Sequence, residues 1–217
     1  MAKVNCGFHF FQSLQVLFGV CILLVGFGAR AASLEELKQS YGLPADLDMA
    51  YWKESYEARL MDWGKALAVN PCLNKGTVIL AHTYMHRLHL CEEGRLVSSH
   101  PIAIGRKGIN KRSEGDYKTP VGVYPLAAPR ESDRYGMFIP VGYPTAEQRR
   151  QGYTGGAIGI HGPYFRFFQL WGFFNILFDW TQGCLAVGTD SEIARISDWV
   201  VKHPKVTVNI FDERYKQ

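Results

Sequence analysis

The sequence predicts a mostly β (α+β) fold, a β-sandwich with one helix near the C-terminus and a small helical segment before it. Short apolar runs follow one another from residue 77, and glycine and proline separate them, as in a series of strands and turns. Helix-capping sequences and apolar residues at helical spacing lie on either side of this stretch. The helices are therefore expected at the two ends of the mature chain.

The first 31 residues (1–31) are typical of a secretory signal peptide. The apolar run Leu14–Phe27 follows a single basic residue, Lys3, and Ala29-Arg30-Ala31 supplies the small residues of a cleavage site. The run is shorter than the roughly 20 residues that cross a bilayer, so an uncleaved inner-membrane anchor is the weaker alternative. We expect a periplasmic protein that is cleaved near Ala31.

Residues 32–71 are expected to form a helical N-terminal segment. Ser33 to Glu36 fits a capping box, and a second helix is expected after Asp46. In that helix, large apolar residues at spacings of three and four form one stripe: Trp52, Tyr56, Leu60, Trp63 and Leu67. We expect the stripe to pack on the main domain, and the alternative is a helix that binds a partner.

Residues 72–213 are expected to form the main domain. The predicted strands are 78–80, 88–90, 96–104, 121–124, 157–160 and 206–211. A capping box from Thr189 to Glu192 opens a helix that ends at His203-Pro204. One face of this helix is apolar, with Ile193, Ile196, Trp199 and Val200.

Composition narrows the class of protein. Charged residues make up 20% and aromatic residues 13% of the chain, so a folded core is expected rather than disorder. A net charge of +4 among 217 residues is too small to indicate a nucleic-acid partner. Five cysteines are too few for a disulfide-rich scaffold, but an odd number of cysteines in an exported protein needs an explanation.

Two residues suggest acyl-transfer chemistry. Cys184 follows a glycine, which lets the backbone turn tightly and direct amide N–H groups beside the sulfur. Such donors stabilise the oxyanion when a thiolate attacks a carbonyl. His161 ends an apolar strand next to Gly162, where it can exchange protons with a thiol. From these patterns alone, a buried structural cysteine and a structurally satisfied histidine remain alternatives.

These motifs resemble the L,D-transpeptidase catalytic domain, the YkuD-type family of bacterial cell-wall enzymes. Its signature is His-Gly and, after a spacer, Ser/Thr-x-Gly-Cys, which is present here as His161-Gly162 and Thr181-Gln182-Gly183-Cys184. Lys118–Tyr124 matches the family's Thr-Pro-x-Gly-x-Tyr/Phe strand. The run Asp179–Val187 is most similar to the YafK-like branch, and the resemblance covers about residues 77–211.

The resemblance implies a cysteine acyltransferase acting on peptidoglycan stem peptides that contain diaminopimelate. It implies Cys184 as nucleophile, His161 as general base and acid, and the amides of Gly183 and Cys184 as oxyanion donors. The third catalytic group in this family is often a backbone carbonyl, and Asp179 is equally well explained by a structural role. Residues expected to contact substrate are Gly162, Thr181 and Tyr143. No metal and no cofactor are implied, and we expect a monomer.

Two departures from the family pattern leave the reaction open. Gln182 replaces a second histidine and Ala186 replaces an Arg or Asn of many members, and both fit the branch in which hydrolysis is also expected. The alternatives to transpeptidation are therefore an L,D-carboxypeptidase or endopeptidase, including one that releases a wall-linked lipoprotein. A further alternative, from another class, is a catalytically silent wall-binding protein.

Three secondary features remain. Cys6 and Cys21 leave with the signal peptide, so if Cys184 stays reduced as the nucleophile, Cys72 and Cys91 are left to form a disulfide in an oxidising compartment. Three histidines near the first hairpin suggest a metal site only weakly: His82, His86 and His89. The spacer after Gly162 is dense in aromatic residues, which suggests a lid or a substrate wall, with core packing and membrane-surface contact as alternatives.

Overall fold

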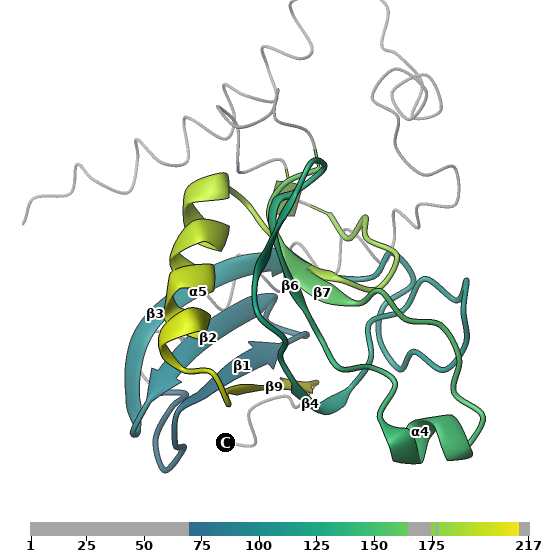
Figure 1. The fold of residues 1–217 in the computed structure, drawn as a ribbon, viewed down its shortest axis with the longest axis horizontal. Helices are drawn as coiled ribbons and strands as arrows, with labels where there is room; N and C mark the ends of the chain where they lie inside the picture. Colours follow the sequence, from purple (N-terminus) through teal and green to yellow (C-terminus); the bar gives the residue numbers. More distant parts are fainter. Residues whose placement is uncertain (1–69, 165–174, 177, 213–217) are drawn as a thin grey trace, which may run out of the picture. The chain divides into compact units, whose positions relative to one another are not determined.

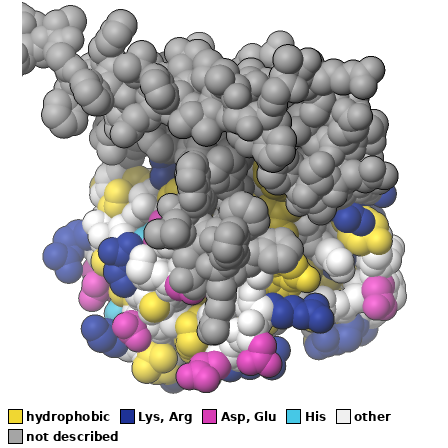
Figure 2. Space-filling view, turned by 90° about the horizontal axis from the view of Figure 1, so that it is seen from above, with side chains coloured by type: hydrophobic (Ala, Val, Ile, Leu, Met, Phe, Trp, Pro, Cys, Tyr) yellow, Lys and Arg dark blue, Asp and Glu magenta, His cyan; other side chains and the backbone are white. Residues whose placement is uncertain are grey.

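A computed structural model describes residues 70–164, 175, 176 and 178–212 (Figure 1). The predicted signal peptide, nearly all of the predicted helical segment and most of the aromatic spacer lie outside the described residues. No helix within the described part of the chain has the length and apolar character needed to cross a membrane. On the face seen in Figure 2, acidic and basic side chains of the described residues are interspersed.

Nine strands form one sheet, which confirms the mostly β class. They are β1 (Val78–His82), β2 (Arg87–Glu92), β3 (Arg95–Ala103), β4 (Gly122–Pro125), β5 (Arg130–Ser132), β6 (Gly136–Pro140), β7 (Gly159–His161), β8 (Leu185–Val187) and β9 (Thr207–Phe211). The helices within the described residues are α4 (Ala146–Arg150) and α5 (Asp190–Lys202). The strand order is β4-β9-β1-β2-β3-β8-β7-β6-β5.

The sheet is assembled largely from segments that are far apart in the sequence. The first three strands form an antiparallel meander, whereas the C-terminal β9 inserts between β4 and β1 and runs parallel to β1. Beyond this meander in the order, β8 pairs antiparallel with β3 and parallel with β7. Figure 1 shows β6 and β7 crossing the direction of β1 to β3, so the sheet curls.

The six predicted strands are found, with shifted ends, but β5, β6, β8 and α4 were not predicted. The strands β5 and β8 are three residues long, and three residues cannot display the alternation that identifies a strand. The helix α4 has only five residues, although Thr145 and Gln148 form its capping box. Such short elements depend on tertiary pairing rather than on a local sequence signal.

The predicted C-terminal helix is confirmed as α5. Thr189 and Glu192 form the expected reciprocal capping box, with the Glu192 amide donating to the Thr189 hydroxyl at 3.2 Å. The apolar face that was predicted is buried, and Ile193 and Ile196 are fully enclosed. This face packs with β-strand residues such as Leu185 in the main hydrophobic core. The helix therefore holds the end of β8 in place, directly after the nucleophile motif.

The predicted disulfide between Cys72 and Cys91 is present, with Cα atoms 5.4 Å apart. Both residues are fully buried, and together with Leu80 they form a second, smaller apolar cluster. Asn70 extends the connection, since its side chain donates to the Gly94 carbonyl at 2.8 Å. The start of the described chain is thus fixed to the β2–β3 hairpin.

Candidate active site

The parallel pairing of β7 with β8 brings Cys184 near His161. His161 pairs with Ala186, and Cys184 lies two residues before Ala186, directly ahead of β8, so it is placed diagonally across from the histidine. With strands about 4.8 Å apart and a rise of about 3.3 Å per residue, the two Cα atoms are about 8 Å apart. A histidine and a cysteine at this diagonal separation can direct their side chains toward each other.

The turn that carries Cys184 requires its glycine. Gly183 has φ +127°, a conformation that other residues rarely adopt, and a Cβ atom there would lie 2.5 Å from the Lys118 carbonyl oxygen. Thr181 closes the turn from inside, because its hydroxyl donates to the Cys184 carbonyl at 2.8 Å and accepts from the Gly183 amide at 3.1 Å. The thiol itself donates to the Ala157 carbonyl at 3.5 Å.

One tautomer of His161 fits its surroundings. Nδ1 lies 2.7 Å from the Gly162 carbonyl oxygen, which can only accept, so Nδ1 carries the proton and Nε2 keeps its lone pair. Gly162 must be glycine here, because a Cβ atom would lie 2.5 Å from the Tyr135 carbonyl oxygen. The imidazole is 1% exposed. It is therefore oriented to accept a proton at one nitrogen.

Burial keeps both groups neutral at pH 7. Desolvation lowers the pKa of His161 to about 4, although the hydrogen bond to the Gly162 carbonyl works in the opposite direction. Cys184 is partly exposed as a residue, but the burial of its thiol raises the thiol pKa to about 11 against the opposing effects of the Gly159 amide and Lys111. The site is thus a neutral thiol beside a neutral imidazole, which suits proton transfer during attack rather than before it.

The structure shows the contacts of three residues that the sequence assigned to binding: Gly183, Thr181 and Gly162. The Gly183 amide already donates to Thr181, which leaves the Cys184 amide as the remaining predicted oxyanion donor. Thr181 was expected to contact substrate, but it is 2% exposed and bonded within the turn. Gly162 orients His161 through its carbonyl and is itself buried. Both residues shape the site from inside instead of facing a ligand.

Tyr143 is also placed differently from the expectation. It was predicted to contact substrate, but it is 5% exposed in the hydrophobic core, with its ring edge-on to Tyr124 at 5.8 Å between centroids. Its hydroxyl donates to the Lys111 carbonyl at 3.3 Å, and burial raises its pKa to about 12. Tyr143 therefore supports the loop that contains Lys111.

That loop supports the nucleophile turn from one side. Asp116 receives hydrogen bonds from the Lys111 ammonium at 2.8 Å and from the backbone amides of three neighbours. Burial alone would raise the pKa of Asp116, but these donors hold it at about 2, so the carboxylate is ionised. The organised loop brings the Lys118 carbonyl against Gly183.

Aromatic side chains surround the imidazole, and one of them, Tyr164, belongs to the aromatic spacer that the sequence singled out. The Tyr135 ring stacks on His161 at 4.0 Å between centroids, and the Trp180 ring meets it edge-on at 5.7 Å. Tyr164 lies 5.9 Å from Tyr135 and 6.1 Å from Trp180, between centroids. Burial, followed by the nearby Cys184, raises the pKa of Tyr135. No sequence motif marks Tyr135, whereas Trp180 lies inside the nucleophile motif.

The histidines near the first hairpin do not form a metal site. His86 faces Asp179, His82 packs against the Phe211 ring at 4.7 Å between centroids, and His89 is buried in the sheet. Within the described ranges, no cluster of three or more His, Cys, Asp or Glu residues is arranged to hold a metal ion.

Comparison with known proteins gives a consistent family. A family model described as the L,D-transpeptidase catalytic domain (YkuD) matches residues 76–208, which is more than half of the chain and contains the whole candidate site. Among curated proteins, no sequence match reaches significance.

The chain is also similar to solved structures. The helical cell shape determining protein Pgp2 from Campylobacter jejuni is 28% identical, with a TM-score of 0.51, over 63% of this chain and 48% of that one. A mutant of the same protein is 26% identical, with a TM-score of 0.51, over 74% of this chain and 56% of that one. An L,D-transpeptidase from Xylanimonas cellulosilytica is 17% identical, with a TM-score of 0.42, over 70% of this chain and 68% of that one. This chain spans about half the length of the Pgp2 chains.

Proposed function

The chain belongs to the L,D-transpeptidase catalytic domain family, and we propose that it is a periplasmic cysteine acyltransferase acting on diaminopimelate-containing peptidoglycan stem peptides. The family is one that acts on peptidoglycan. The proposal for this chain depends most on the diagonal pairing of Cys184 with His161 across β7 and β8. The hydrogen bond from His161 Nδ1 to the Gly162 carbonyl supports it, because it leaves Nε2 as the base.

The first half of the proposed reaction forms a thioester. His161 Nε2 takes the thiol proton as Cys184 Sγ attacks the carbonyl carbon at the L-centre of the donor peptide. The amide of Cys184 stabilises the oxyanion of the tetrahedral intermediate. The intermediate then collapses, the C–N bond breaks, and the imidazolium returns its proton to the leaving amine of the D-residue.

The second half transfers the acyl group to an acceptor. His161 Nε2 takes a proton from the incoming amine or water, which attacks the thioester carbon, and Cys184 leaves as the thiol after receiving that proton. An amine acceptor gives transpeptidation, and water gives L,D-carboxypeptidase or endopeptidase activity. Because the bond attacked and the acyl-enzyme are the same, both reactions need the same two side chains.

Hydrolysis is the second candidate, and the residues around Cys184 favour keeping it. Gln182 and Ala186 replace polar residues that many L,D-transpeptidases carry there. Pgp2 is described as a helical cell shape determining protein, which makes wall remodelling a reasonable task for a relative. The hydrolytic alternative includes release of a lipoprotein linked to the wall.

The test is to incubate the purified full chain with diaminopimelate-containing tetrapeptide muropeptides and with wall that carries bound lipoprotein. Mass spectrometry separates a new cross-link, a lost terminal D-Ala and a released lipoprotein. We expect Cys184→Ala and His161→Ala to abolish the reaction, because each removes one partner of the proton transfer. Turnover that survives Cys184→Ala would refute the mechanism.

A carbapenem distinguishes an active site from a silent wall-binding protein. Its strained amide should acylate a competent Cys184, which is detected as a mass increase of the intact protein. A folded wild-type protein with an accessible thiol and no adduct would favour the silent alternative.

A further inference from the structure

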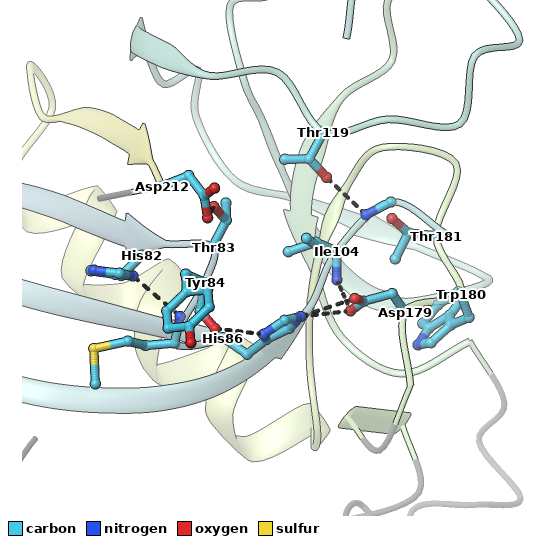
Figure 3. A network of polar contacts seen from close by, with 12 residues as sticks. His82, Thr83, Tyr84, His86, Ile104, Thr119, Asp179, Trp180, Thr181 and Asp212 are labelled. Carbon is cyan, nitrogen blue, oxygen red and sulfur yellow. Dashed lines mark hydrogen bonds and ion pairs between the residues drawn. The ribbon is translucent and has the colours of Figure 1, made fainter. Parts of the chain in front are cut away.

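A buried histidine–carboxylate pair lies directly behind the nucleophile turn and is not used by the proposed mechanism. His86 Nε2 is 2.9 Å from one Asp179 carboxylate oxygen and 3.1 Å from the other, and each of the two side chains is 4% exposed (Figure 3). The two residues are 93 positions apart in the sequence. His86 follows the turn after β1, whereas Asp179 begins the motif that ends in Cys184.

Both ring nitrogens of His86 have a partner. Nδ1 lies 3.2 Å from the Tyr84 carbonyl oxygen, and Nε2 faces the carboxylate of Asp179. The ring is therefore held from two sides, and its contact with Asp179 is buried away from water.

Asp179 also fixes the backbone beside the turn. Its Oδ1 accepts the Ile104 amide at 3.0 Å, and the Thr181 amide donates in turn to the Ile104 carbonyl at 3.2 Å. The Arg106 amide then donates to the Thr181 carbonyl at 2.9 Å, so the segment after β3 runs parallel to the motif. Figure 3 shows His86 pointing at Asp179 from one side and Ile104 from above it.

Trp180 and Thr181 extend this arrangement to the two catalytic side chains. The Trp180 ring contacts the His161 ring, and the Thr181 hydroxyl bonds both backbone groups of the nucleophile turn. A displacement of Asp179 would therefore move both the imidazole's neighbour and the turn that presents the sulfur.

We propose that His86 and Asp179 are positioning residues that hold the Trp180–Cys184 turn in register with His161, so that thiol, imidazole and substrate carbonyl align. The inference rests on the proposed function, since it assigns these residues to the same reaction. Neither residue needs to touch the substrate. Their effect on acylation is expected to appear in the rate of the chemical step and not in binding.

The test compares the carbapenem acylation of variants of the full chain. Formation of the adduct is followed by intact mass, which gives the maximal acylation rate (kinact) and the carbapenem concentration for half of that rate (KI). Asp179→Ala removes both hydrogen bonds, and kinact should fall about 30- to 100-fold, as expected for a misplacement of about 1 Å. KI should stay within threefold of the wild-type value. Asp179→Asn keeps the acceptor for the Ile104 amide and can donate to neutral His86, so its kinact should stay within about fivefold. These comparisons are made at a temperature at which circular dichroism shows each variant to be folded.

A control is provided by His100 and Glu192, a second histidine–carboxylate pair, in which His100 is buried and Glu192 half-buried; the two side chains are 3.4 Å apart and join β3 to the cap of α5. His100→Ala should lower the unfolding midpoint but leave kinact within threefold. If Asp179→Ala does not fold, His86→Ala provides the second disruption. A second readout is alkylation of Cys184 by iodoacetamide, which should become at least fivefold faster in the disrupted variant because solvent reaches the thiol.

The outcomes separate the two proposals. A folded Asp179→Ala protein with kinact within threefold of wild type overturns the positioning role, as does an equal loss in Asp179→Asn. A wild-type protein that forms no adduct refutes the proposed function instead. In that case unchanged alkylation in Asp179→Ala would still refute the positioning role, and faster alkylation would support it.

Discussion

The neutral state of the Cys184–His161 pair gives a quantitative prediction for thiol reactivity. Burial raises the thiol pKa to about 11, so the thiolate fraction at pH 7 is about 10⁻⁴. An unperturbed cysteine with a pKa near 8.5 has about 3% thiolate at the same pH. The folded protein should therefore react about 300 times more slowly with a small alkylating agent than a cysteine in an unfolded chain.

The assay is the rate of iodoacetamide alkylation of the folded full chain from pH 6 to pH 9.5, followed by intact mass. Only thiolate reacts, so the rate should rise about tenfold per pH unit over the whole range without a plateau. The same protein in urea provides the reference, with a plateau above about pH 8.5. Cys184→Ala in the folded state is the control, because it reports any alkylation at Cys6 and Cys21, and Cys72 and Cys91 are protected by their disulfide.

A different profile would refute the reasoning. If Cys184 and His161 formed a thiolate–imidazolium pair, the folded protein would show a plateau of rapid alkylation that begins well below pH 7. That result would mean that proton transfer precedes attack, and that burial does not determine the charges in this site. An alkylation rate at pH 7 equal to that of the unfolded chain would have the same consequence.

Three further predictions concern stability and the turn. Burial lowers the pKa of His89 from its ordinary 6.5 to about 4 in the folded protein. The unfolded chain therefore binds a proton at His89 more readily than the folded protein does, so His89 destabilises the fold increasingly as the pH falls from 6.5 towards 4 and has no such effect above pH 6.5. His89→Leu should therefore raise the free energy of unfolding by about 3 kcal/mol more at pH 4 than at pH 7.5 in urea titrations, and an equal gain at both pH values would contradict this. Replacing both Cys72 and Cys91 by Ser removes a disulfide that closes a loop with a sequence separation of 19, and should lower the free energy of unfolding by about 3 kcal/mol in the same titration. An unchanged urea midpoint would show that the disulfide does not stabilise the fold. Gly183→Ala puts a Cβ atom 2.5 Å from the Lys118 carbonyl oxygen and should abolish carbapenem acylation, with Gly76→Ala, where space is open, as the tolerated control.

The fold could be predicted from the sequence where an element is long enough to show its own pattern. The capping box at Thr189 and the apolar face of α5 are local signals, and both are found as expected. The strands β6 and β8 could not be predicted in this way, because Met137 to Pro140 and Leu185 to Val187 are extended only through pairing with distant partners. The arrangement of the strands is likewise invisible in the sequence, since β9 pairs with β1 across more than 120 residues.

The candidate site could likewise be predicted from the sequence only in part. The motifs identify Cys184 and His161 as chemically suited residues, and the parallel β7–β8 pairing places them diagonally across from each other. The motifs do not indicate where a hydroxyl points, and for this reason Thr181 was expected to face substrate although it bonds inside the turn. Tyr135 had no signal, because its contact with His161 depends on how the β5–β6 turn meets the end of β7.

The neutral state of Cys184 and His161 makes their alignment by the buried His86–Asp179 pair more important. When a nucleophile is already ionised, poor alignment affects only its attack on the carbonyl. With a neutral thiol, Cys184 must transfer its proton to His161 Nε2 in the same event, so a displaced turn impairs both proton transfer and attack. A site with a thiol pKa of about 11 therefore depends more on rigid positioning than an ion pair would. A rise in alkylation without a plateau and a fall in kinact for Asp179→Ala are expected together, because both follow from the burial of one turn.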